Sequence, residues 1–393
     1  MSEPATSVAA PVPPVRAVFA PRERRILLWL TVAAVSWRWL CAVQLPLPSV
    51  AACRDLWLAQ RLANGEFAPL AEVLAQPWWA LLLWPPVAAG CDAFTAAQVL
   101  ACIAGGLLVW PVALAAEKLR QGAGLPAAVL ALGAGGPAAA AASGAVTPLL
   151  ELAVAMAVVG IVARRPVLAA VAGAVALAPG LEAIATGALF RTAPWQWHEL
   201  RLGWGTSAAL ALLCVLPPRP RCLPVLGSFA AAMFATAAVR GGLQWLLISS
   251  PVVIVLAGTG LARLPVRLRD VALCAAVLAE GWIGWQALEP RTAIVERALG
   301  EHLQGLLTEG LEVVSDLPRV LLFAGSEPTA LRDADALLAG AAGDKVQFVV
   351  LGRALARQTT VTAALASRFA HFELQHDLGD LVAERKLAVF VRR

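Results

Sequence analysis

The sequence predicts a polytopic α-helical membrane protein with a small soluble α/β domain at its C-terminal end. Of the 393 residues, 60% are hydrophobic and only 15% are charged, and the mean hydropathy is +0.74. This composition excludes an ordinary soluble protein. The apolar residues concentrate before residue 288, whereas the remaining residues have a normal charge density and alternate between strand-like and helix-like patterns.

We therefore expect three parts. Residues 1–25 form a flexible cytoplasmic N-terminus that ends in a basic cluster, residues 26–290 form the transmembrane domain, and residues 291–393 form an extracytoplasmic α/β domain. No small-residue cleavage site closely follows the first apolar run. We interpret that run as an uncleaved anchor and not as a signal peptide.

A helix typically needs about 20 residues to cross the hydrocarbon core, and the shortest crossing helices have about 17. With this measure we expect about nine spans, at residues 26–45, 95–117, 124–142, 147–163, 166–188, 203–217, 223–239, 243–262 and 270–288. The apolar stretch at residues 77–90 is too short and too rich in proline to cross. It lies at the interface or re-enters the membrane.

The basic residues fix the expected orientation. With the N-terminus in the cytoplasm, the clusters Lys118/Arg120, Arg164/Arg165, Arg219/Arg221 and Arg263/Arg267/Arg269 all fall on the cytoplasmic side, as the positive-inside rule requires. Topology thus explains the net charge of +5 without nucleic acid as a partner. The outer face then carries the first loop (residues 46–94), the loop at residues 195–199, Arg240 and the C-terminal domain.

In the C-terminal part, residues 291–311 have the pattern of an amphipathic helix. We expect strands at residues 319–325, 346–352 and 387–393, and helices at residues 329–341 and 360–369. Strands that alternate with helices predict an α/β sandwich with parallel pairing. No glycine-rich phosphate fingerprint follows a strand, so we expect a structural or acceptor-facing cap.

Several segments of residues 26–290 together resemble the GT-C superfamily of membrane glycosyltransferases. The first span is followed by an outer loop with Asp55 and the run LAQRLANGEF, then by QPWWALLLWPP, and then by a span that ends in AAEKL. Residues 148–183 and 240–261 are also similar to family segments. The most similar groups are the protein O-mannosyltransferases and the aminoarabinose transferases.

This resemblance implies transfer of a sugar from a polyprenyl-phosphate carrier to a lipid, glycan or protein acceptor. The reaction would take place at the outer face of a bacterial inner membrane, among membrane lipids. Asp55 matches the family's acidic residue in the first loop, which acts as general base and in some members helps to hold a divalent metal ion. An N-cap role for Asp55 in the helix that begins at that point is the structural alternative.

The remaining candidates would bind substrate. Arg240 matches a family arginine at the start of a late span, and its guanidinium suits the lipid phosphate. Arg54 either contacts phosphate or extends to lipid head groups, and Arg38, inside the first span, either contacts phosphate or forms a structural pair. Trp79 either stacks on the sugar or belongs to the interfacial aromatic belt. His198 and Glu199, in a Trp-rich outer loop, either join a metal site or mark the membrane boundary.

The sequence also departs from the family. Leu56 stands where a second acidic residue often follows, and Thr147, Ala178 and Gly241 replace polar family residues. A catalytically inactive GT-C-like scaffold or envelope-assembly protein is therefore the alternative function. A small-solute transporter would show inverted repeats and charged residues at mid-membrane. Of these features the sequence shows only Arg38.

Overall fold

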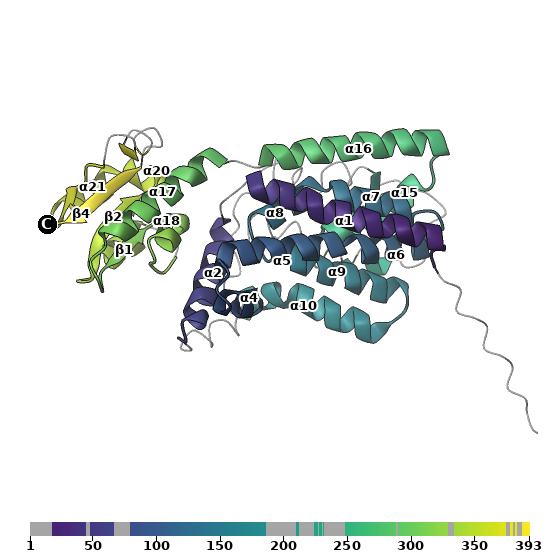
Figure 1. The fold of residues 1–393 in the computed structure, drawn as a ribbon, viewed down its shortest axis with the longest axis horizontal. Helices are drawn as coiled ribbons and strands as arrows, with labels where there is room; N and C mark the ends of the chain where they lie inside the picture. Colours follow the sequence, from purple (N-terminus) through teal and green to yellow (C-terminus); the bar gives the residue numbers. More distant parts are fainter. Residues whose placement is uncertain are drawn as a thin grey trace, which may run out of the picture.

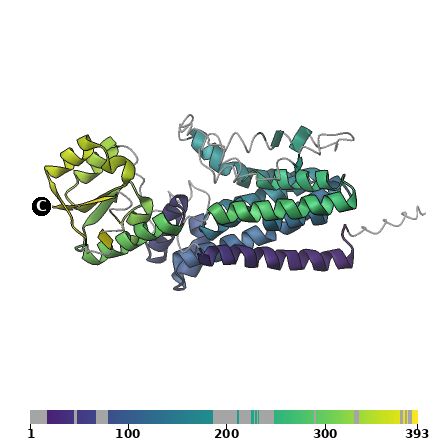
Figure 2. The same ribbon diagram turned by 90° about the horizontal axis from the view of Figure 1, so that it is seen from above.

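The computed structural model describes residues 18–44, 48–66, 79–185, 210–211, 224–226, 228–229, 231, 248–287, 290–328, 334–374, 378–379, 382 and 387–393. A bundle of helices and a smaller group of strands and helices lie end to end (Figure 1). The view from above shows the same arrangement (Figure 2).

The bundle is built from helices α1 (Pro21–Gln44), α2 (Val50–Ala63), α4 (Trp79–Ala88), α5 (Ala93–Leu107), α6 (Val109–Leu119), α7 (Gly124–Gly133), α8 (Gly135–Ala142), α9 (Thr147–Val162), α10 (Pro166–Ala185), α15 (Ser250–Leu261) and α16 (Val266–Ala287). Among the described residues, α1 and the joined helices α5 and α6 are long and apolar enough to cross a membrane, judged by length and composition.

Several helices follow the predicted spans, whereas the span predicted at residues 124–142 is divided into the short helices α7 and α8. Helix α1 matches residues 26–45, α5 and α6 together match residues 95–117, and α9 matches residues 147–163. The predicted spans at 203–217 and 223–239 lie almost wholly outside the described residues. The predicted first loop is largely helical, since it holds α2 and α4, and α4 is a ten-residue helix that includes two prolines.

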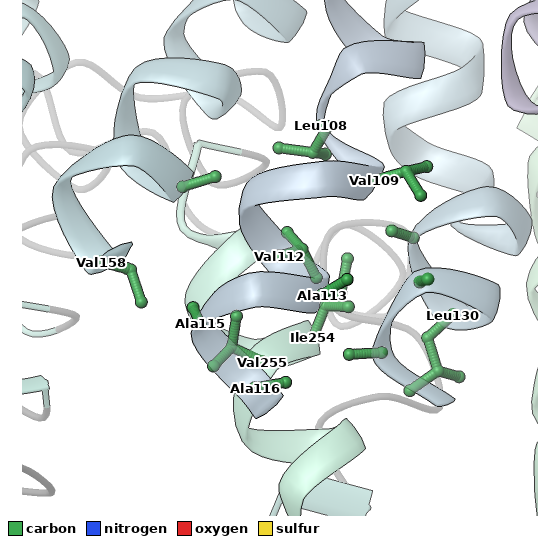
Figure 3. Close-up of a cluster of buried hydrophobic side chains, with 14 of the residues drawn as sticks. Leu108, Val109, Val112, Ala113, Ala115, Ala116, Leu130, Val158, Ile254 and Val255 are labelled. Atoms are coloured by element: carbon green, nitrogen blue, oxygen red, sulfur yellow. The ribbon is translucent and has the colours of Figure 1, made fainter. Parts of the chain in front are cut away.

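Small side chains let the helices of the bundle approach one another. The main core joins α6, α7, α9 and α15, with Val112, Ala113, Leu130, Val158 and Ile254 among its buried residues (Figure 3). A Cβ atom placed on Gly258 of α15 would lie 2.5 Å from the Cβ atom of Ala127 on α7. Close backbone approach through glycine and alanine is typical of helix packing in membranes.

The bundle leaves large apolar side chains on its outside. On α1 these are Leu28, Trp29, Leu40 and Val43, and on α16 they are Val266, Val271, Leu278 and Trp282. Apolar surface of this extent on two helices indicates an apolar surrounding or a partner.

The C-terminal elements are α17 (Pro290–Leu306), β1 (Glu312–Ser315), α18 (Pro318–Phe323), α19 (Ala334–Ala341), β2 (Val346–Leu351), α20 (Arg353–Ala356), α21 (Thr359–Ala366), β3 (Phe369–His371) and β4 (Ala388–Arg392). The sheet has the order β1-β2-β4-β3. Only β1 and β2 pair in parallel, and β4 is antiparallel to both of its neighbours.

Two predictions for this part were wrong. Residues 319–325 are not a strand, because residues Pro318–Phe323 form helix α18. Proline at the first helical position favours a helix start, and a short apolar run does not distinguish a strand from a buried helix turn. The expected all-parallel pairing was also wrong, since β3 and β4 form a hairpin-like antiparallel pair. Helices α17 and α21 and strands β2 and β4 were predicted correctly.

Candidate functional site

Helix α2 carries Asp55 and lies at the end of the bundle that faces the C-terminal elements (Figure 1). Ser49 caps its first turn, because the Ser49 side chain accepts a hydrogen bond from the backbone N–H of Ala52 at 3.1 Å. The helix ends at Asn64 and Gly65, where Gly65 adopts φ +83°. The side chain of Ser49, and not that of Asp55, therefore serves as the N-cap, which removes the structural alternative for Asp55.

Asp55 lies on the buried face of α2. It follows Ala52 by three positions and precedes Ala59 and Leu62 by four and seven, so the four residues share one helix face. The Asp55 residue is only 9% exposed. A carboxylate on an otherwise apolar face is costly to bury unless polar groups surround it. Its placement suits a general base that is shielded from bulk water.

The turn between α8 and α9 accepts hydrogen bonds from the residues that precede or form α2, α4 and α5. Three donors converge on its carbonyl groups: the Ser49 N–H donates to Ser143 O at 3.0 Å, Trp79 Nε1 donates to Gly144 O at 3.2 Å, and Gln98 Nε2 donates to Ala142 O at 2.7 Å. Gln98 also donates to Ala42 O at the end of α1. The bond from Ser49 places the start of α2 on this turn, and the bonds from Trp79 and Gln98 place α4 and α5 on the same turn.

Trp79 is packed inside the protein. The residue is 1% exposed and belongs to the core that α2, α4 and α5 share. Its indole N–H is satisfied by the carbonyl of Gly144. A ring that is covered on both sides cannot stack on a sugar, so neither the stacking role nor the belt role that the sequence suggested for Trp79 fits this burial.

Arg38 is fully buried, at 0% exposure, and does not reach the surface of the protein. Its Nη1 atom donates to Ala34 O at 3.2 Å and its Nη2 atom donates to Ala131 O at 3.1 Å. The bond to Ala131 ties α1 to α7. The structural alternative therefore accounts for Arg38 better than a phosphate contact does.

Sequence reasoning missed Glu151, which is also 0% exposed and lies on α9. Its charge and that of Arg38 attract each other, yet within the described part of the chain neither carboxyl oxygen has a hydrogen-bond partner. The hydroxyl of Ser250 is close to Glu151 but lacks hydrogen-bond geometry. A charged residue inside an apolar segment is a signal for a pair or a site, and the same signal singled out Arg38.

The two arginines of α2, Arg54 and Arg61, are accessible, unlike Arg38 of α1. Arg54 is exposed, at the start of the helix. Arg61 donates through Nε to Glu66 Oε2 at 2.6 Å, and its guanidinium lies 4.7 Å from the centroid of the Trp57 ring. Three predicted substrate-binding residues, Arg240, His198 and Glu199, lie outside the described residues.

The cysteines and acidic residues show no metal centre in the described part of the chain, since no group of three or more His, Cys, Asp or Glu side chains is placed to hold an ion. Cys41, Cys53 and Cys102 are buried, whereas Cys91 and Cys274 are exposed. Burial raises the pKa of the Cys53 thiol to about 12, although the nearby Arg319 lowers it. Cys53 is therefore a protonated thiol at neutral pH.

Helix α18 joins the C-terminal elements to α2. Arg319 Nε donates to Pro48 O at 2.7 Å, and Arg319 Nη1 donates to Glu296 Oε2 of α17 at 3.0 Å. Leu322, also on α18, packs against the core around Leu56 and Trp79. Sequence reasoning missed Arg319 and Glu296, because their partners are far away in the chain.

The fold is similar to that of a solved protein. The crystal structure of ArnT from Cupriavidus metallidurans, bound to undecaprenyl phosphate, superimposes with a TM-score of 0.62, and the match covers 94% of this chain and 98% of that chain at 13% sequence identity. Neither the protein-family models nor the curated proteins give a match. At this identity the likeness shows the fold alone, which this chain shares with ArnT.

Proposed function

We propose that the chain is an integral-membrane, multi-pass glycosyltransferase of GT-C type. It moves a sugar from a polyprenyl-phosphate carrier to an acceptor at the outer face of a bacterial inner membrane. The single observation that carries this proposal is the fold match over nearly the full length of both chains to ArnT, whose structure holds undecaprenyl phosphate.

Asp55 is the proposed general base. During transfer an acceptor hydroxyl loses its proton as its oxygen attacks the anomeric carbon, and a carboxylate within hydrogen-bond reach takes that proton. The low exposure of Asp55 and the position of its helix α2 at the end of the bundle (Figure 1) support this role. Arg240 stays the proposed contact for the lipid phosphate, on the family resemblance alone.

The position of the C-terminal elements supports the proposed topology. Helices α2 and α18 are in contact, so Asp55 and the C-terminal sheet lie at the same end of the bundle. The apolar side chains on the outside of α1 and α16 suit contact with lipid tails. In the proposed orientation this shared end faces outward.

The transporter hypothesis gains no support from the buried charges. Arg38 and Glu151 are the kind of charged pair that a transporter places at mid-membrane. Both residues are 0% exposed, however, so they do not line a passage in this conformation. Arg38 instead donates to the carbonyl of Ala131, which joins α1 to α7.

The proposed function is tested with the purified full-length chain in lipid nanodiscs. Labelled hexose and pentose donors on undecaprenyl phosphate are supplied with a lipid, a glycan or a peptide acceptor, and release of undecaprenyl phosphate and label transfer are both followed. We expect transfer from at least one donor. Binding of undecaprenyl phosphate without transfer from any donor would favour the inactive scaffold. If the protein shows no binding and no transfer, both the glycosyltransferase and the scaffold proposals are contradicted.

A further inference from the structure

Arg319 holds two parts of the chain at once. Its Nε atom donates to the carbonyl of Pro48, immediately before the N-cap of α2, and its Nη1 atom binds the Glu296 carboxylate of α17. The side chains of Arg319 and Glu296 are 23% and 10% exposed. A charge-assisted bond between groups this well shielded is stronger than one in open solvent.

The packing around this contact leaves little freedom. Helices α17 and α18 approach so closely at Gly300 that an added Cβ atom would lie 2.7 Å from Phe323 Cβ. Val320 and Leu321 fill the core of the C-terminal elements, whereas Leu322 reaches the core of α2. Helix α18 thus belongs to both cores, and Arg319 stands where they meet.

The contact acts on the first turn of α2. The carbonyl that Arg319 binds belongs to the residue before Ser49, whose side chain caps the helix. Asp55 follows Ser49 by six residues, which is about 9 Å along a helix. Because a short helix moves as a unit, the direction of its first turn determines where the Asp55 carboxylate lies.

We propose that Arg319 is a positioning residue for Asp55, and that the C-terminal elements hold α2 in its working orientation through the Arg319–Pro48 and Arg319–Glu296 contacts. This inference rests on the proposed function for the role of Asp55. The part that concerns the hold on α2 is independent of catalysis. Loss of Arg319 lets the start of α2 leave the surface of α18.

Cys53 reports that movement directly. Its thiol lies on α2 near Arg319 and Glu296, and the residue is 0% exposed. A maleimide therefore reacts with it only when α2 opens. Cys41 on α1 and Cys102 on α5 are buried in the bundle and are not on the helix whose start Arg319 contacts, so they serve as internal references.

The experiment measures maleimide labelling of each cysteine by peptide mass spectrometry, alongside kcat and KM for transfer, in the full-length protein. In Arg319→Gln we expect Cys53 to be labelled about tenfold faster, in line with loss of a charge-assisted hydrogen bond. Cys41 and Cys102 should stay protected. We expect kcat to fall about tenfold or more, since small misplacement of a catalytic group is enough, while KM stays the same. Arg319→Lys should recover most of both properties.

The matched control is Arg357→Gln, which removes an exposed arginine of the C-terminal elements and should change neither measurement. If Cys41 and Cys102 also become reactive in Arg319→Gln, the bundle itself has opened, and Glu296→Gln is the variant that decides. If Cys53 in a folded Arg319→Gln protein is labelled at the unchanged rate, the claim that Arg319 holds α2 is wrong. Faster labelling with unchanged kcat would overturn the positioning role. Absence of transfer by the unmodified protein would instead contradict the proposed function, while Cys53 labelling still decides whether Arg319 holds α2.

Discussion

Arg38 of α1 and Glu151 of α9 are both completely buried in the bundle and attract each other, but no hydrogen bond joins them in the described structure. Removing one charge leaves the other buried and uncompensated. We expect Arg38→Met to destabilise the protein by about 3–5 kcal/mol, and Arg38→Met/Glu151→Leu to recover most of that loss. Unfolding in detergent micelles measures both changes.

The control for this pair is Arg61→Met. Arg61 and Glu66 form an ion pair at an accessible site, so its loss should change stability by about 1 kcal/mol or less. If the effects of the two substitutions in the double variant simply add, Arg38 and Glu151 do not depend on each other.

Substitutions of Trp79 distinguish a packing role of its ring from a sugar-binding role. Because the ring is packed in the core, we expect Trp79→Ala to cost about 3–5 kcal/mol of stability. Trp79→Phe keeps most of the volume but leaves the Gly144 carbonyl without its donor, at a cost of about 1–3 kcal/mol. Trp282→Ala, at an exposed position, is the control. A Trp79→Phe protein of unchanged stability that has lost only its sugar transfer would support stacking instead.

Two helical glycines make a matched pair. Gly258 has no room for a methyl group, since Ala127 lies across the helix contact, whereas an added Cβ atom at Gly281 of α16 meets nothing within 4 Å. We expect Gly258→Ala to destabilise the bundle by about 1–3 kcal/mol and Gly281→Ala to be neutral or slightly stabilising. Equal melting temperatures for the two variants would mean that α7 and α15 do not approach as closely as described.

The parallel strands β1 and β2 are joined at their ends by a carboxylate. The N–H of Gly352 donates to Asp316 Oδ1 at 2.6 Å. Burial raises the pKa of the Asp316 carboxyl above its ordinary value of 3.8, and the bond from Gly352 offsets this only in part.

Because the folded pKa of Asp316 is the higher one, the stability it contributes is present in full below pH 3.8 and is lost as the pH rises through the folded value. Asp316→Asn keeps the acceptor oxygen but has no carboxyl to ionise, so its stability should not fall in this way as the pH rises. The measurement is the hydrogen-exchange protection of the β2 peptide in the variant, divided by that in the unmodified protein at the same pH. This ratio should increase as the pH rises above 3.8. A ratio that does not change with pH would contradict the raised pKa.

Hydropathy and length were enough to predict most of the bundle helices, because long apolar segments have few alternatives. They were not enough for α18, because this helix has only six residues, Pro318–Phe323, and its short apolar run has no clear periodicity. They also gave no sign of strands β1 and β3, which are four and three residues long. Short elements take their form from tertiary packing.

The candidate site was predictable only in part. Asp55 could be singled out as a carboxylate after the first span, but its place on the buried face of α2 follows from packing. The contact between Arg319 and Pro48 joins residues 271 positions apart, so no local pattern indicates it. Trp79 shows the opposite error, since composition suggested an accessible ring where the fold buries one.

The most direct test of the central claim is the rate of sugar transfer by Asp55→Asn. Asp270→Asn at the start of α16 is the matched control, because it makes the same chemical change at an exposed carboxylate. A general base contributes about 10²–10⁴-fold, so we expect kcat to fall by that factor in Asp55→Asn and to stay within about twofold in Asp270→Asn. Full transfer activity in a folded Asp55→Asn protein would contradict the account.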